Sequence, residues 1–153
     1  MFNNLDIPNN ENRIIGGSLA SDGQFPHQVS LQNNSGYHFC GGSIVNDRWV
    51  VSAAHCTIER TPSNTRVRVG SNSISSGGVF HTISEIRNHP GYNSNTVTND
   101  ICTIQTKETI SFNKNVRAIS LACSYIGEEN AQVSGWGKTS VSVKVIMLLL
   151  SIL

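Results

Sequence analysis

Hydrophobic and polar residues alternate over short stretches of this chain, with the two-residue period of strands rather than the longer period of helices. Between the stretches stand residues that favour turns, such as Asn-Asn-Ser-Gly at 33–36, Ser-Ser-Gly-Gly at 75–78 and His-Pro-Gly at 89–91. The pattern predicts six strands with no convincing helix between them, at 28–32, 37–45, 49–52, 65–69, 79–86 and 100–105. Six short strands indicate an all-β fold, either a small closed barrel or a sandwich.

The two ends of the chain depart from this pattern. Residues 1–13 are polar and rich in asparagine, and we interpret them as an unstructured leader. Residues 131–134 form a seventh strand candidate, and 141–145 alternate like a strand before the apolar run 146–150. That run is too short to span a bilayer, which needs roughly 20 apolar residues. We interpret the tail as an edge strand or a terminus from outside the fold, with a membrane anchor as the alternative.

Length and charge narrow the class of protein. With 153 residues the chain is long enough for one domain with its own core. Charged residues make up 14% and the net charge is +1, so nothing attracts the protein to nucleic acid or anionic membranes. The first residues have neither the basic start nor the apolar run of a signal peptide. Taken alone, this would indicate a cytosolic protein, but the motifs below lead us to expect that the start is incomplete.

The chain has four cysteines, an even number that permits disulfides without proving them. They form no Cys-x-x-Cys pair and no His/Cys cluster at zinc spacing. We therefore expect no structural metal and no cofactor. The cysteines are Cys40, Cys56, Cys102 and Cys123.

Five short segments stand out between residues 13 and 137. They are Arg-Ile-Ile-Gly-Gly at 13–17, Phe-Cys-Gly-Gly-Ser-Ile at 39–44, Val-Ser-Ala-Ala-His-Cys at 51–56, Asn-Asp-Ile at 99–101 and Ser-Gly-Trp-Gly at 134–137. In this order and at comparable spacing, they resemble the motifs of the chymotrypsin/trypsin family of serine proteases. The resemblance covers everything except the two ends.

The resemblance implies the six-stranded antiparallel N-terminal barrel of the two-barrel chymotrypsin-like fold, with the second barrel mostly missing from this sequence. It also divides the chain into three parts. Residues 1–13 are expected to be the remnant of an activation propeptide, and 14–140 a partial peptidase domain. Residues 141–153 are expected to be an apolar tail that need not belong to the family.

His55 is the expected catalytic histidine. It follows a strand and two small residues, Ala53 and Ala54, which let the backbone pack tightly while the imidazole projects. Asp100 begins an apolar strand, where a carboxylate is costly unless a partner satisfies it. The resemblance supplies the partner: the aspartate orients the histidine ring and stabilises the imidazolium. We therefore predict that His55 and Asp100 meet.

The nucleophilic serine expected after Asp100 is not found. The family's order is His, Asp, Ser, with the serine in a Gly-Asp-Ser-Gly-Gly-like segment, and no such segment follows in these 153 residues. The Ser-Ser-Gly-Gly at 75–78 lies before Asp100 and resembles a hairpin loop, and Ser43 belongs to a predicted strand. The oxyanion amides, the specificity pocket and the aspartate that receives the new N-terminus fall in the same missing half.

Arg13-Ile14 resembles the activation junction of the family, since a basic residue precedes a β-branched pair and two glycines. A trypsin-like protease would then cleave after Arg13. The resemblance implies polypeptide substrates and protease inhibitors as partners of the full-length form, and an extracellular, secreted location. It implies no nucleic-acid partner and no membrane partner.

The resemblance also suggests how the cysteines are used. Cys56 is expected to pair with Cys40, tying the histidine turn to the second predicted strand. Cys102 occupies a strand position where a free, buried thiol fits as a small hydrophobe. Cys123 is expected in the linker between the two barrels, paired with a cysteine of the missing half, and a Cys102–Cys123 bridge is the alternative.

Two loops concern binding and modification. The loop 70–82 is rich in serine and glycine and has no acidic residue, so we expect no calcium where some trypsins bind it through carboxylates. Asn33-Asn34-Ser35 matches the acceptor pattern for N-glycosylation at an expected hairpin tip.

The sequence thus favours a secreted, trypsin-like serine endopeptidase, represented by a truncated chain that lacks the nucleophile and is inactive as given. The alternative is a non-catalytic, protease-like binding module, and a third possibility is a fragment with no stable fold. The sequence downstream of codon 140 would separate these hypotheses, because a Gly-Asp-Ser-Gly-Gly segment there supports the enzyme.

Overall fold

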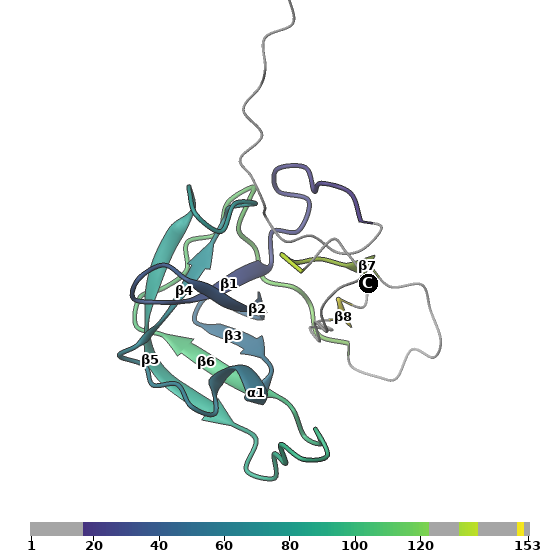
Figure 1. The fold of residues 1–153 in the computed structure, drawn as a ribbon. Coiled ribbons are helices and arrows are strands. Elements are labelled where there is room, and N and C mark those ends of the chain that lie inside the picture. The colour runs from purple at the N-terminus through teal and green to yellow at the C-terminus, as the bar shows by residue number, and fades with distance from the viewer. Residues whose placement is uncertain (1–16, 123–131, 138–149, 152–153) are drawn as a thin grey trace, which may run out of the picture.

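The computed structural model of the protein describes residues 17–122, 132–137 and 150–151. Six antiparallel strands form a closed barrel in the order β1-β2-β3-β6-β5-β4, with β1 and β4 paired to close it (Figure 1). The barrel, rather than the sandwich, is therefore the fold, and the all-β prediction is confirmed. The strands are β1 Gln28–Asn33, β2 His38–Ile44, β3 Trp49–Ser52, β4 Thr65–Val69, β5 Val79–Asn88 and β6 Cys102–Thr106.

The barrel interior is filled by alternate residues of the strands, as a period of two requires. Val29 and Leu31 of β1 are fully buried, and so are Val67 of β4, Val50 of β3 and Ile104 of β6. The second residue of the Gly-Gly pair in β2, Gly42, has to be a glycine because of its close contact with β3. A side chain there would come within 2.9 Å of both Val50 Cγ1 and Val51 O, so only glycine lets β2 and β3 approach this closely.

Two elements near the expected site differ from the sequence-based prediction. A single helical turn, α1 at Ala54–Thr57, follows β3 where no helix was expected. Four residues are too few to show a helical period in the sequence, so the pattern could not reveal it. The last barrel strand begins at Cys102 rather than at residue 100, so that Asp100 precedes the strand.

The two remaining strands lie outside the barrel. Gln132–Val133, β7, falls within the seventh predicted strand and pairs antiparallel with Leu150–Ser151, β8. The predicted leader 1–13 and the alternating stretch 141–145 lie outside the described residues. No helix among the residues that the structure describes is long and apolar enough to cross a membrane.

Candidate active site

His55 lies on α1, directly after β3. Ala53, in extended conformation, caps this turn, and Ala54, its first residue, is completely buried. Backbone hydrogen bonds from Cys56 N to Ala53 O (3.2 Å) and from Ile58 N to Ala54 O (2.9 Å) hold the turn closed. Small residues at 53 and 54 let α1 sit close to the barrel while the His55 side chain stays 35% exposed.

Asp100 lies at a sharp bend just before β6. Asn99 has a left-handed backbone (φ 55°), and its side-chain Nδ2 donates to Gly91 O at 2.9 Å. Short hydrogen bonds from Ile101 N to Asn99 O (2.9 Å) and from His89 N to Ile101 O (3.0 Å) complete the bend. Asparagine tolerates left-handed geometry better than most residues. Sequence reasoning missed the role of Asn99, although an asparagine directly before the aspartate was a usable signal.

His55 and Asp100 meet as predicted, although 45 positions separate them in the chain. The ring nitrogen Nδ1 of His55 lies 2.6 Å from Asp100 Oδ2. The backbone N–H of His55 donates to the other carboxylate oxygen, Oδ1, at 2.8 Å. The Asp100 side chain is 18% exposed, so solvent weakens these contacts only partly. Two contacts from one residue fix both the position of the carboxylate and the orientation of the ring.

Burial and hydrogen bonding have opposite effects on the pKa of the Asp100 carboxyl group. Burial alone would raise the pKa of its carboxyl group. The hydrogen bonds from the side chain and backbone of His55, its charge and the backbone N–H of Ala54 together outweigh burial and lower the pKa. Asp100 is therefore ionised at neutral pH and can only accept hydrogen bonds. The proton of a neutral His55 ring must then lie on Nδ1, which leaves the lone pair of Nε2 available.

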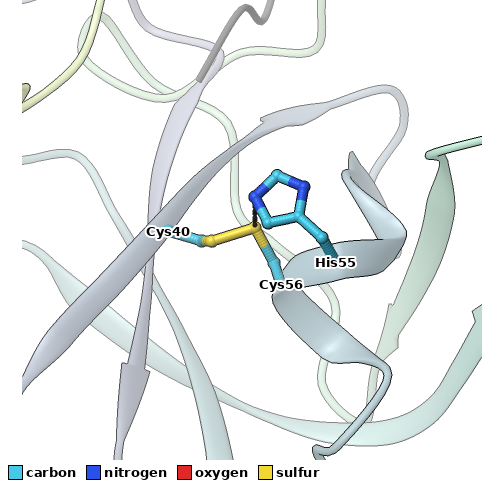
Figure 2. A group of neighbouring side chains, drawn as sticks. All are labelled: Cys40, His55 and Cys56. Atoms are coloured by element: carbon cyan, nitrogen blue, oxygen red, sulfur yellow. Dashed lines mark hydrogen bonds between the residues drawn. A yellow bond between two sulfur atoms is a disulfide. The ribbon is translucent and has the colours of Figure 1, made fainter. Parts of the chain in front are cut away.

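The Nε2 atom of His55 points toward the disulfide, 3.4 Å from Cys56 Sγ (Figure 2). A disulfide sulfur carries no hydrogen, so it cannot occupy the Nε2 lone pair by donating to it. Cys40, His55 and Cys56 are close enough to suggest a metal site among the described residues. The sulfurs of Cys40 and Cys56 are bonded to each other in the disulfide, however, and offer no thiolate to a metal.

The predicted disulfide is confirmed. Cys40 of β2 and Cys56 of α1 are bonded, with their Cα atoms 6.1 Å apart. Cys102 is a free and buried thiol, as expected, and burial raises its pKa. Its Sγ contacts Ala53 O at 3.3 Å, so it packs under the histidine turn. Cys123 and the expected activation junction, Arg13-Ile14, lie outside the described residues.

The Ser-Gly-Trp-Gly motif lies on another side of the barrel from α1 (Figure 1). Trp136 Nε1 donates to Asn72 O at 2.7 Å, and Ser134 Oγ donates to Gln28 Oε1 at 2.7 Å. A cavity of about 400 Å³ opens here, between residues 17–25 and this motif. Neither His55 nor Asp100 lines it, so the cavity is separate from the candidate catalytic pair.

Comparison with known proteins agrees with the motifs and the geometry. The Trypsin family profile matches residues 14–149. The chain is 44% identical over 135 residues to trypsin beta of Drosophila erecta, and 45% identical to trypsin alpha of Drosophila melanogaster. It is 41% identical to trypsin alpha-4 of Lucilia cuprina. Each alignment covers 88% of this chain but only 52 or 53% of the relative, so the chain spans about half the length of these relatives. The chain belongs to the trypsin family.

Proposed function

We propose that this protein is a serine-type endopeptidase of the trypsin class, in which His55 is the general base and Asp100 orients it. The observation that carries the proposal is the two-point contact of Asp100 with the Nδ1 atom and the backbone N–H of His55. It gives the ring one orientation and one tautomer. Family membership supports the same assignment, because both residues lie within the part of the chain that the family model matches.

The roles of the two residues follow from their protonation states. His55 Nε2 accepts the proton of a serine hydroxyl as that oxygen attacks the scissile carbonyl, and later donates the proton to the leaving amine. Asp100 remains ionised and stabilises the imidazolium that forms in between. These roles are those of the family's established mechanism. What this chain contributes is the geometry that permits them.

The nucleophile is not among these 153 residues in any segment that matches the family. Ser43 lies within β2 and is buried, and the serines at 75 and 76 lie in the loop between β4 and β5. We therefore expect these 153 residues alone to be inactive, even after cleavage between Arg13 and Ile14. The missing oxyanion amides add to the loss, because each such donor typically contributes about 2.7 to 4 kcal/mol.

Activation and location are part of the proposal. Cleavage after Arg13 by a trypsin-like protease would free Ile14 as a new N-terminus. The substrates would be polypeptides, and protease inhibitors would bind at the same site as the substrates. The Cys40–Cys56 disulfide supports an extracellular location, because such bonds form and persist in oxidising compartments.

Sequencing the transcript beyond codon 140 and assaying its product test the proposal. We expect a Gly-Asp-Ser-Gly-Gly-like segment downstream, and peptidase activity after activation at Arg13. The Asp100→Asn variant should lose activity on the order of 10⁴-fold, which is the value known for this family itself. The His55→Ala variant should be at least as inactive.

His27→Ala is the matched control, because the ring of His27 packs edge-on against Phe25 and contacts neither His55 nor Asp100 among the described residues. It should retain full activity. Peptidase activity that survives His55→Ala would contradict the assignment. A reproducible stop after Leu153 together with an inactive product would contradict the enzyme and favour the non-catalytic binding module.

A further inference from the structure

The turn between β1 and β2 carries the one Asn-x-Ser/Thr acceptor pattern in the chain, Asn33-Asn34-Ser35. The structure places Asn33 as the last residue of β1 and closes the turn with two backbone hydrogen bonds, from Gly36 N to Asn33 O and from Asn33 N to Tyr37 O, both 3.0 Å. Asn34 and Ser35 are exposed, and Tyr37 at the far side of the turn is 70% exposed. The pattern therefore lies on an open turn of the folded protein.

The Asn33 side chain uses only its oxygen to hold this turn. Oδ1 accepts the backbone N–H of Ser35 at 3.0 Å and that of Tyr37 at 2.9 Å. Attachment of a sugar replaces one hydrogen on the amide nitrogen and leaves the carbonyl oxygen unchanged. Both hydrogen bonds would survive the modification, so a glycan at Asn33 is compatible with the native turn.

Other asparagines of the chain differ in this respect. Asn34 Nδ2 donates to Ser63 O at 2.9 Å, Asn72 Nδ2 to Ala20 O at 2.8 Å and Asn99 Nδ2 to Gly91 O at 2.9 Å. In each of them the nitrogen that would carry a sugar helps to hold the fold. Asn33 thus combines the acceptor pattern with a side chain whose nitrogen does not hold the turn.

From this arrangement we propose that Asn33 is an N-glycosylation site. In the reaction, the Asn33 amide nitrogen attacks C1 of the first sugar of a polyprenyl-diphosphate-linked oligosaccharide. The C1–N bond forms, the C1–O bond to the diphosphate breaks with its electron pair, and the amide releases one proton. The modification requires passage through the secretory pathway, and so it rests on the secreted location in the proposed function.

The glycan would be attached to a different element from the one that carries the candidate catalytic histidine. Figure 1 shows the β1–β2 turn at one side of the barrel and α1, which carries His55, at the lower end of the barrel in this view. Arg66 holds the turn from the barrel, with Nη2 donating to Asn34 O at 2.8 Å. The sugar would therefore extend from the β1–β2 turn, which β2 and the Cys40–Cys56 disulfide connect to the turn that carries His55.

The test directs the chain into the secretory pathway of insect cells behind a cleavable signal peptide. We expect a single upward shift on a denaturing gel that peptide N-glycosidase removes, leaving aspartate at position 33 in peptide mass spectra. Supplying the signal peptide separates this test from the natural location, which can fail independently.

Ser35→Ala is the informative variant, because the turn uses the backbone N–H of Ser35 and not its hydroxyl. It should abolish the shift, whereas Ser35→Thr and Asn34→Gln should keep it. If the chain is not secreted, cell-free translation with microsomes reports the same modification without a need for folding. A translocated, protease-protected chain with unmodified Asn33 would overturn the proposal.

Discussion

Two charged side chains of the described residues, the partly buried Asp100 and the buried Arg68, are satisfied in different ways. Asp100 precedes β6 and is held by the ring and backbone of His55. Arg68 of β4 is only 6% exposed, and its guanidinium donates to Gly77 O and Ile74 O. Burial lowers the pKa of Arg68, and no carboxylate forms an ion pair with it among the described residues.

Asp100 and Arg68 differ in the kind of group that satisfies their charge. The partner of Asp100 is an imidazole, which can accept a proton at one ring nitrogen while it donates from the other. The partners of Arg68 are backbone carbonyls, which cannot. The guanidinium of Arg68 holds the serine-rich loop that follows β4 through the carbonyls of Ile74 and Gly77. Arg68 is therefore structural, whereas Asp100 is a candidate for catalysis.

The largest expected effect on stability concerns the turn that holds His55 beside Asp100. The Cys40–Cys56 disulfide ties this turn to β2. Replacing both cysteines, Cys40→Ala and Cys56→Ala, should lower the free energy of unfolding by roughly 3 kcal/mol, because the bond closes a loop of 16 residues. Urea unfolding of the oxidised protein and the double variant measures the difference. Cys102→Ala is the control for loss of a thiol alone and should cost less. Equal stability of the double variant and the oxidised protein would contradict the expectation.

A smaller effect on stability is expected from a substitution at Arg68. Arg68→Met should lower the free energy of unfolding by about 2 kcal/mol, because it leaves the carbonyl groups of Gly77 and Ile74 without their charged donor. Limited proteolysis should then cut within the loop 71–78. Arg117→Gln is the matched control, since Arg117 is exposed, and its effect should stay within about 0.5 kcal/mol. An Arg68→Met protein as stable as the control would show that the loop does not depend on the guanidinium.

The smallest effect is a dependence of stability on pH. Burial lowers the pKa of His27, His38 and His81, and for His81 the charge of Glu108 partly opposes this. Below the unfolded pKa of 6.5, the unfolded chain binds protons that the folded protein does not, so stability should fall as the pH falls from 7.5 to 5.5. Asp100 adds a further loss below pH 3.8, where the unfolded carboxyl binds a proton first.

Urea midpoints at the two pH values measure the histidine effect. His81→Gln should flatten the slope, because His81 is buried and its Nδ1 has no partner within the described residues. The exposed Asn95, which has no titratable side chain, serves as the control, and Asn95→Gln should leave the slope unchanged. A wild-type midpoint that does not change between the two pH values would contradict the prediction.

The sequence predicted the barrel well where burial follows a strict alternation. Val67 and Val69 of β4 point inward, as their spacing indicates. Arg68 between them belongs to the outer face by the same rule, yet it is buried because the loop 71–78 folds over it. Alternation tells which face a side chain takes, but not what covers that face. The role of Arg68 could not be predicted for this reason.

The candidate site was predicted from motifs rather than from pattern. Nothing in the alternation of residues joins His55 to Asp100, and the resemblance to a known family supplied the pairing. The short helix α1 and the left-handed Asn99 were missed, because each is a local backbone feature of one to four residues. Both serve the site: α1 presents His55, and the bend at Asn99 turns Asp100 toward it.

The central claim, that Asp100 prepares His55 as a base, is tested most directly by the position of the ring proton. A two-bond proton–nitrogen correlation spectrum at a pH where the ring is neutral reports which nitrogen carries it. We predict the proton on Nδ1 of His55, and a shift toward the Nε2-protonated tautomer in Asp100→Asn. A proton on Nε2 in the wild-type protein, or identical His55 signals in Asp100→Asn, would contradict the account.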